Sequence, residues 1–135
     1  MVHFKKVEIS HFRNLISTSF IPSPSLNIIS GSNVSGKSSI LEAIYYVATG
    51  NSFRTSRLSH VISHENDCFI LYSELANLIS HRIGIRRCRN LNHQTRIDGK
   101  DISKRSELVQ LITLQIISPE SISLLLEGSD LRRNY

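Results

Sequence analysis

The sequence predicts an α/β fold in which a buried strand leads through a glycine-containing loop into a helix. Three observations indicate this class. A short apolar run at residues 26–29 precedes a loop at residues 31–38 that matches the pattern G-x-x-x-x-G-K-[ST], and after this loop the apolar side chains change to helical spacing. The 135 residues suffice for one domain or for a piece of a larger one.

The first part of the chain is expected to form two short strands, then a buried strand and a helix. Residues 6–10 and 18–21 alternate apolar and polar side chains, and the stretch between them is polar. Prolines then interrupt the pattern, and the apolar density of residues 26–29 suits a strand buried on both faces. From Ile40 to Ala48 the apolar spacing is helical, and Gly50 is a typical left-handed helix end.

The second part is expected to contain an antiparallel, β-rich subregion within residues 66–100. Strands are expected at residues 68–75, 82–88 and 95–97, with Asp98 and Gly99 in a tight turn. Arginines occupy even and odd positions of the middle strand, so they should project from both of its faces.

Three more elements are expected after this subregion. Residues 103–111 favour a helix and residues 113–117 a strand. Ser118 and Pro119 should open another helix that Gly128 closes. Because the chain stops at Tyr135 without a terminus signal, we expect residues 1–135 to be the N-terminal part of a single domain, truncated before its second half.

Composition excludes several classes of protein. Hydrophobic residues make up 40% and charged residues 20%, but no run approaches the roughly 18 apolar residues of a membrane span, and no secretory signal is present. The cysteines Cys68 and Cys88 form no CxxC pair, so reduced thiols and a cytoplasmic location are expected. The histidines lack zinc-binding spacing, and a chance surface pair is favoured for His60 and His64.

The positive charge is concentrated in one stretch of the chain. The net charge is +5, and residues 81–105 contain eight Lys or Arg against two Asp. A basic stretch on an otherwise balanced chain indicates a polyanionic partner such as nucleic acid, and the alternative is a solvated basic surface.

The loop at residues 31–38 is the most specific motif, with a chance frequency of about half a per cent in a chain of this length. Its glycines allow backbone N–H groups to surround phosphate oxygens at the start of a helix. Lys37 would reach the β- and γ-phosphates and Ser38 would bind Mg²⁺. The alternative is a loop without a ligand. The residues expected to contact the nucleotide here are Gly31, Ser32, Asn33, Val34, Ser35, Gly36, Lys37, Ser38 and Ser39.

Val34 is the exception within this motif. It occupies the fourth position of the loop, where most such loops have glycine, and a β-branched residue resists positive φ. A left-handed backbone at Val34 would cost about 1–2 kcal/mol and weaken nucleotide binding roughly tenfold.

These residues resemble the N-terminal part of the RecF family of bacterial recombination-repair ATPases. Beyond the loop, the resemblance rests on residues 12–14, 41–44, 50, 53–55, 96–99 and 115–120, so it spans nearly the whole chain in order. It implies lobe I of a P-loop NTPase head of the ABC/SMC type, an α/β lobe with an antiparallel β-rich edge that a helical lobe follows.

The resemblance also implies site residues and partners. Gln115 would be the catalytic Q-loop glutamine and a metal contact, and Arg13 and Asn14 would lie near the nucleotide. The implied cofactors are ATP and Mg²⁺. The implied partners are duplex or gapped DNA, a second copy of the chain in an ATP-dependent homodimer, recombination mediator proteins and the RecA recombinase, which the family helps load at gaps during DNA repair, replication and the SOS response.

The chain lacks part of the chemistry that hydrolysis needs. No apolar strand ends in the Asp that would add a second carboxylate to the metal, and the signature motif of the class is absent. Glu127 is interpreted as a helix-end residue, and a surface or packing role is favoured for Glu42. We therefore expect weak nucleotide binding without useful hydrolysis.

Two alternatives remain open at this point. One is a P-loop protein of another class, such as a small-molecule kinase, and the other is a degenerate module that binds DNA or a partner without hydrolysis. The N-K-x-D motif of GTPases is absent. The residues proposed to contact nucleic acid are Arg54, Arg57, Arg86, Arg87 and Arg89, and solvated loop arginines are the alternative for the first two.

Overall fold

The chain forms one antiparallel sheet with its helices packed on one side. The structure is a computed structural model, and it describes residues 1–118. The elements are β1 (His3–Phe12), β2 (Leu15–Phe20), α1 (Lys37–Thr49), the 3₁₀ turn η1 (Leu58–His60), β3 (Cys68–Ala76), β4 (His81–Cys88), β5 (Gln94–Ile97), β6 (Lys100–Asp101) and α2 (Ser106–Leu111).

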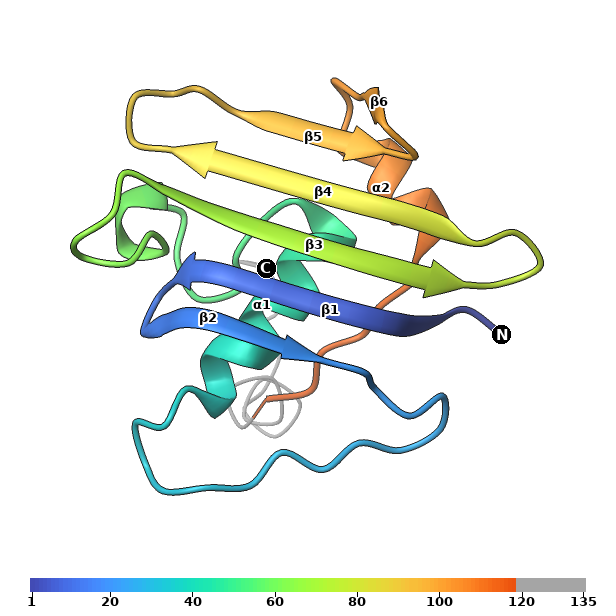
Figure 1. Cartoon of the computed structure of the whole chain (residues 1–135), viewed down its shortest axis with the longest axis horizontal. Helices are drawn as coiled ribbons and strands as arrows, with labels where there is room; N and C mark the ends of the chain where they lie inside the picture. Colours follow the sequence, from blue (N-terminus) through green and yellow to red (C-terminus); the bar gives the residue numbers. More distant parts are fainter. Residues whose placement is uncertain (119–135) are drawn as a thin grey trace, which may run out of the picture.

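The six strands are ordered β2-β1-β3-β4-β5-β6, and every neighbouring pair is antiparallel. The expected opening pair of strands and the expected antiparallel subregion are therefore parts of one sheet (Figure 1). Asp98 and Gly99, both with positive φ, form the expected turn between β5 and β6. The two helices expected before residue 112 are confirmed, although α2 begins only at Ser106.

Helices α1 and α2 lie on the same side of the sheet, behind it in Figure 1. Alternation along the strands directs one set of side chains toward α1, such as Phe69, Leu71 and Leu75 of β3, and the other set toward the open face. An aromatic cluster fixes α1 on the sheet, because the ring of Phe12 packs edge-on against Phe69 at 5.0 Å and against Tyr46 at 6.1 Å. The core between α1 and the sheet positions the loop that precedes α1.

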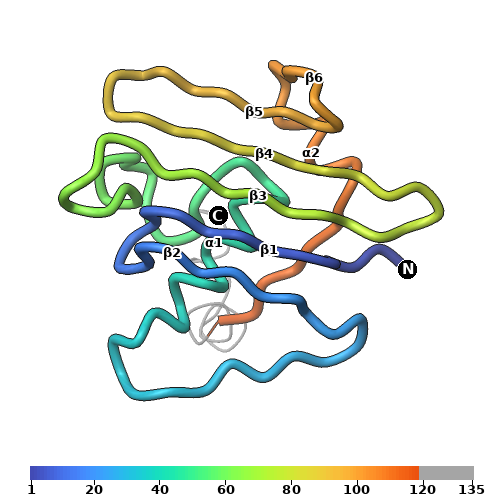
Figure 2. The backbone as a smooth tube through the Cα atoms, viewed as in Figure 1, coloured from blue at the N-terminus to red at the C-terminus, as the bar shows by residue number. Residues whose placement is uncertain are grey.

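Two expected strands do not form. Residues 26–29 and 113–117 have no regular secondary structure and join no sheet, and Leu26 and Ile28 are exposed. The prediction of a buried strand before the loop was therefore wrong for the described residues. A strand buried on both faces needs neighbouring strands, and in residues 1–118 all strands belong to one sheet, which residues 26–29 do not join. Residues 21–36 instead make a long excursion between β2 and α1 (Figure 2).

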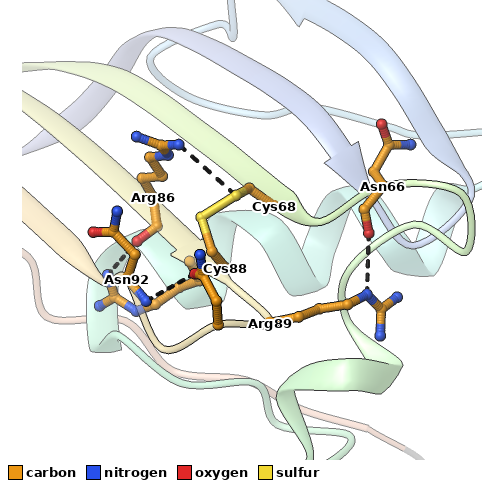
Figure 3. Close-up of a disulfide and its surroundings, with 8 residues drawn as sticks. Asn66, Cys68, Arg86, Cys88, Arg89 and Asn92 are labelled. Carbon is orange, nitrogen blue, oxygen red and sulfur yellow. Dashed lines mark hydrogen bonds between the residues drawn. A yellow bond between two sulfur atoms is a disulfide. The ribbon is translucent and has the colours of Figure 1, made fainter.

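The expectation of reduced thiols was also wrong, because Cys68 and Cys88 form a disulfide with an S–S distance of 2.02 Å. The antiparallel register places the two residues directly opposite each other on β3 and β4 (Figure 3). Their separation of twenty residues gave no sign of this, since cross-strand pairing depends on register rather than on spacing.

The described helices are short, and the last expected helix is not among them. Within residues 1–118, no helix has the length and apolar character needed to cross a bilayer. The expected helix after Pro119, with Glu127 and Gly128, lies outside the described residues, as does the end of the chain at Tyr135.

Candidate nucleotide-binding site

The loop before α1 contains three residues with positive φ. Val34 has φ +66°, Gly36 has φ +100° and Gly31 has φ +154°. The left-handed conformation anticipated for Val34 is thus present, and its side chain is 93% exposed, so packing does not compensate for the strain. Gly36 lies directly before the first residue of α1, where the partial positive charge of the helix dipole is greatest.

Lys37 folds back over this loop. Its Nζ donates to the carbonyl oxygens of Gly31 at 2.7 Å and Ser32 at 2.5 Å. These bonds hold the ammonium group across the loop, so the cation and the helix N-terminus lie together. Such an arrangement attracts an anion with several oxygens.

The turn between β1 and β2 supports the loop from the other side. Asn14 Nδ2 donates to the carbonyl of Val34 at 3.1 Å, and Ser39 Oγ donates to Asn14 Oδ1 at 2.7 Å. Gly36 packs so tightly here that a Cβ would lie 2.7 Å from Leu15 Cδ2. Asn14 is thus placed beside the loop, as expected, although its contacts are to the protein. The left-handed backbone favours glycine at position 36, and a larger residue there would also displace the end of the Leu15 side chain.

Arg13 reaches the same region through a buried ion pair. Its Nη2 and Nε donate to the two carboxylate oxygens of Glu42 at 2.7 and 3.0 Å, and its Nη1 donates to the carbonyl of His60 at 2.7 Å. Arg54 Nη1 contacts the same carboxylate at 3.4 Å, and Glu42 is fully buried. Glu42 therefore has the structural environment of an ion-pair centre rather than that of a surface residue.

A hollow of about 1620 Å³ opens beside the loop and exceeds the roughly 300–1,000 Å³ of ordinary ligand pockets. Most of the expected nucleotide-contacting residues line it. These are Arg13, Asn14, Asn33, Val34, Gly36, Lys37, Ser38 and Ser39. Gly31, Ser32 and Ser35 are not among the lining residues, although the first two hold Lys37.

The opposite wall of the hollow was not anticipated from the sequence. It is formed by His60 at the end of η1 and by the segment between η1 and β3, which includes Ser63, His64, Glu65 and Asn66. This segment has no motif. Backbone bonds bring it to the loop: Arg13 N–H donates to the carbonyl of Val61 at 2.7 Å, and Ser63 N–H donates to the carbonyl of His11 at 2.8 Å. No pattern in the sequence could have indicated these residues.

The predicted metal contacts are separated in the structure. Ser38 lines the hollow at the start of α1, with an exposed side chain next to Lys37. Mg²⁺ bound to a nucleotide needs only one or two protein oxygens, because phosphates and waters supply the rest, so the Ser38 hydroxyl fits this ion. Gln115 lies in the extended segment after α2, exposed and outside the hollow. Its catalytic and metal-binding roles remain predictions.

The arginines proposed to contact nucleic acid lie in different environments. Arg54 and Arg89 line the hollow, and Arg57 is exposed before η1. Arg86 is exposed on the open face of the sheet, whereas Arg87 turns toward α1, with its guanidinium 5.9 Å from the ring centre of Tyr46. Arginines thus project from both faces of β4, as predicted.

The sequence is similar to one known family of proteins over most of its length. Residues 3–124 match the family model described as "RecF/RecN/SMC N terminal domain". The chain is 39% identical over 132 residues to the DNA replication and repair protein RecF of Shewanella denitrificans, covering 97% of this chain and 37% of that protein. The RecF of Shewanella baltica is 42% identical, with 96% of this chain and 36% of the relative covered. The chain therefore spans little more than a third of the length of these relatives.

Solved structures confirm the predicted fold class. A structure titled "Structure of the recombination mediator protein RecF-ATP in RecFOR pathway" aligns with a TM-score of 0.86 at 29% identity, over 99% of this chain and 38% of that one. An SMC ATPase structure at 21% identity aligns with a TM-score of 0.80, over 98% of this chain and 95% of that one, and shares the fold. The resemblance to the N-terminal part of RecF is confirmed, and the chain belongs to the RecF/RecN/SMC N-terminal domain family.

Proposed function

We propose that the hollow beside Lys37 binds the triphosphate of ATP together with Mg²⁺. The observation that carries this proposal is the position of the Lys37 ammonium group across a left-handed loop at the start of α1. It is supported by two structures at 29% identity whose titles name RecF with ATP and with "ATPrS". Arrival of the phosphates would draw Lys37 Nζ from the carbonyls of Gly31 and Ser32 toward the β- and γ-oxygens.

The other residues of the site have supporting roles in this proposal. Ser38 would offer its hydroxyl to Mg²⁺, which when bound neutralises phosphate charge. Asn14 holds the peptide of Val34 in place, so the loop is preorganised before the nucleotide arrives. Arg13 and Arg54 contribute positive charge to the wall of the hollow.

We propose that this chain hydrolyses ATP slowly or not at all. Glu42 is the carboxylate of α1, and its oxygens are occupied by Arg13, Arg54 and Ser52. A phosphate-release assay checks this, and a turnover that disappears in Lys37→Ala would contradict it.

We propose that the whole protein is an ATP-dependent DNA-binding protein of recombinational repair and replication-gap processing. As in the family that the chain resembles, two copies would dimerise around nucleotide in the cytoplasm, bind duplex or gapped DNA, and act with recombination mediators to load RecA during the SOS response. The exposed arginines Arg54, Arg57, Arg86 and Arg89 support the DNA contact. Binding to duplex DNA should weaken with salt, with a slope of about −0.9 per phosphate contacted. A flat salt response would exclude this contact.

A titration of the complete chain with ATP tests the nucleotide site. Calorimetry with Mg²⁺ should give one ATP per chain, and chelating Mg²⁺ with EDTA should weaken binding. ADP should compete, because the loop contacts the β-phosphate as well. The absence of binding at millimolar ATP would contradict the proposal and would favour the alternative of a degenerate module, for which the strained Val34 is the structural argument.

A further inference from the structure

Glu42 is a buried carboxylate with an unusually complete set of partners. It lies on α1 one turn after Ser38 and is 0% exposed. Its oxygens accept hydrogen bonds from Arg13 Nε and Nη2, from Arg54 Nη1 and from Ser52 Oγ at 2.5 Å. A buried ion pair adds little to stability compared with an apolar core, so its role is to be sought in the geometry that it fixes.

Glu42 fixes the turn between β1 and β2 through Arg13. The guanidinium donates from all three of its nitrogens, two of them to Glu42 and the third to the carbonyl of His60. The Arg13 backbone has φ +55°, and its N–H donates to the carbonyl of Val61. A bidentate pair of this kind sets the orientation as well as the distance of the turn.

Through Asn14, the β1–β2 turn also holds the loop before α1. Asn14, the next residue, bonds the carbonyl of Val34 and accepts a hydrogen bond from Ser39. Val34 is the loop residue whose left-handed backbone is unfavourable for its side chain, so an external support is needed at that peptide. Hydrogen bonds join Glu42 to Arg13 and Asn14 to Val34, and Arg13 and Asn14 are consecutive residues of the β1–β2 turn.

The same carboxylate also anchors the segment after α1. Ser52 Oγ donates to Glu42 and accepts hydrogen bonds from the backbone N–H groups of Arg54 and Thr55. One buried group therefore joins the β1–β2 turn, the start of α1 and the segment that follows α1.

We propose that Glu42 is a positioning residue for nucleotide binding, which holds Asn14 against the phosphate loop through Arg13. Glu42 itself touches no ligand in this role. The effect on affinity rests on the proposed function, whereas the effect on the loop of the ligand-free protein does not. Glu42→Gln should keep the shape of the side chain but lose the bidentate acceptor. It should weaken ATP binding by about 10- to 100-fold, the range typical of residues that orient a binding residue without touching the ligand.

The test compares Glu42→Gln with Glu8→Gln in the complete chain. Glu8 pairs with Lys6 on the open face of the sheet, so this control makes the same chemical change away from the hollow. NMR of the ligand-free protein should show displaced signals for the Asn14 side-chain amide and the Val34 backbone amide in Glu42→Gln alone. A fluorescent ATP analogue with Mg²⁺ then gives the affinities.

The outcomes separate the two proposals. Displaced loop signals in Glu42→Gln support positioning, even if the wild-type chain binds no nucleotide and the proposed function fails. Unchanged Asn14 and Val34 signals, with unchanged affinity where the wild type binds, would overturn the inference. Should Glu42→Gln not fold, Arg13→Lys keeps the buried charge paired but cannot bond in a bidentate way, and it should displace the same signals.

Discussion

The arginines beside α1 and those of the β4–β5 hairpin show two uses of the same side chain. Arg13 and Arg54 are far apart in sequence, yet both bond to Glu42 and both line one hollow. The arginines of the hairpin are close in sequence, yet they diverge. Arg82, Arg86 and Arg96 are exposed, whereas Arg87 turns inward to bond Gln94 and Thr95.

Charge density along a chain therefore does not by itself make a charged surface. In Figure 3, Arg86 reaches the disulfide sulfur of Cys68, while Arg89 reaches the carbonyl of Asn66. Arg96 bonds to Asp101, and this hydrogen bond lowers the pKa of the Asp101 carboxyl. Several hairpin charges are thus occupied within the fold, whereas the smaller group beside α1 converges on one site.

The largest effect should come from Lys37→Ala. The ammonium group is the cation placed across the loop, and losing its charge-assisted hydrogen bonds to phosphate should weaken ATP binding about 100-fold. Lys100→Ala on β6, which removes the same side chain from an exposed strand, should leave affinity unchanged. Calorimetric titration measures both affinities. An equal loss of ATP affinity in the two variants would show that the position of Lys37 across the loop does not matter for binding.

Arg87→Ala and Arg86→Ala test the divergence of the hairpin. Arg87→Ala removes three hydrogen bonds and a cation–π contact with Tyr46, so it should lower the free energy of unfolding by about 1–3 kcal/mol. Arg86→Ala should change stability by less than about 0.5 kcal/mol but reduce the salt slope of DNA binding by about 0.9. Urea unfolding and DNA titration at several salt concentrations measure both. A loss of stability in Arg86→Ala and a reduced salt slope in Arg87→Ala would show that the face of β4 does not decide whether an arginine stabilises the fold or contacts DNA.

Val34→Gly should have a smaller effect. Because the left-handed backbone is already present without nucleotide, relief of strain should mainly stabilise the folded chain, by about 1 kcal/mol, and tighten ATP binding only a few-fold. The exposed valine side chain contributes no packing that glycine would lose. Unchanged melting temperature together with unchanged affinity would show that the backbone at this position carries no strain.

The elements predicted from the sequence were those whose signals are local. Period, motif and turn residues predicted α1, the loop and the turn at Asp98 and Gly99, all of which the structure contains. The motif also marked Val34 as the position where a left-handed backbone would be strained. These features depend on residues within a few positions of one another, so a single segment specifies them.

The features that the sequence did not reveal depend on register between distant segments. The disulfide of Cys68 and Cys88 needs β3 and β4 to pair without a shift, and the wall at His64 and Asn66 needs β1 to bond the segment after η1. Glu42 gave no signal either, since a lone glutamate on a helix is usually on the surface. The predicted strand at residues 26–29 was wrong for a related reason. An apolar run in the sequence does not show whether neighbouring strands are present to pair with it.

Asp98→Asn should produce the smallest effect and tests how firmly the hairpin end is held. Asp98 Oδ2 lies 2.7 Å from His81 Nδ1, and Oδ1 accepts the Arg82 N–H at 2.8 Å. The hydrogen bond with His81, followed by that of the Arg82 backbone, lowers the pKa of Asp98 below its ordinary value of 3.8. The stability from this carboxylate is therefore complete above its ordinary pKa and is lost as pH falls through the lowered pKa.

Because the Asp98 side chain is 45% exposed, water screens the pair and the change should be slight. Asparagine tolerates the positive φ at this position, so the turn should persist in the variant. The melting temperatures of wild type and Asp98→Asn should differ at pH 7 and converge below about pH 4. A difference that stays constant down to pH 2 would mean that ionisation of Asp98 does not stabilise the turn.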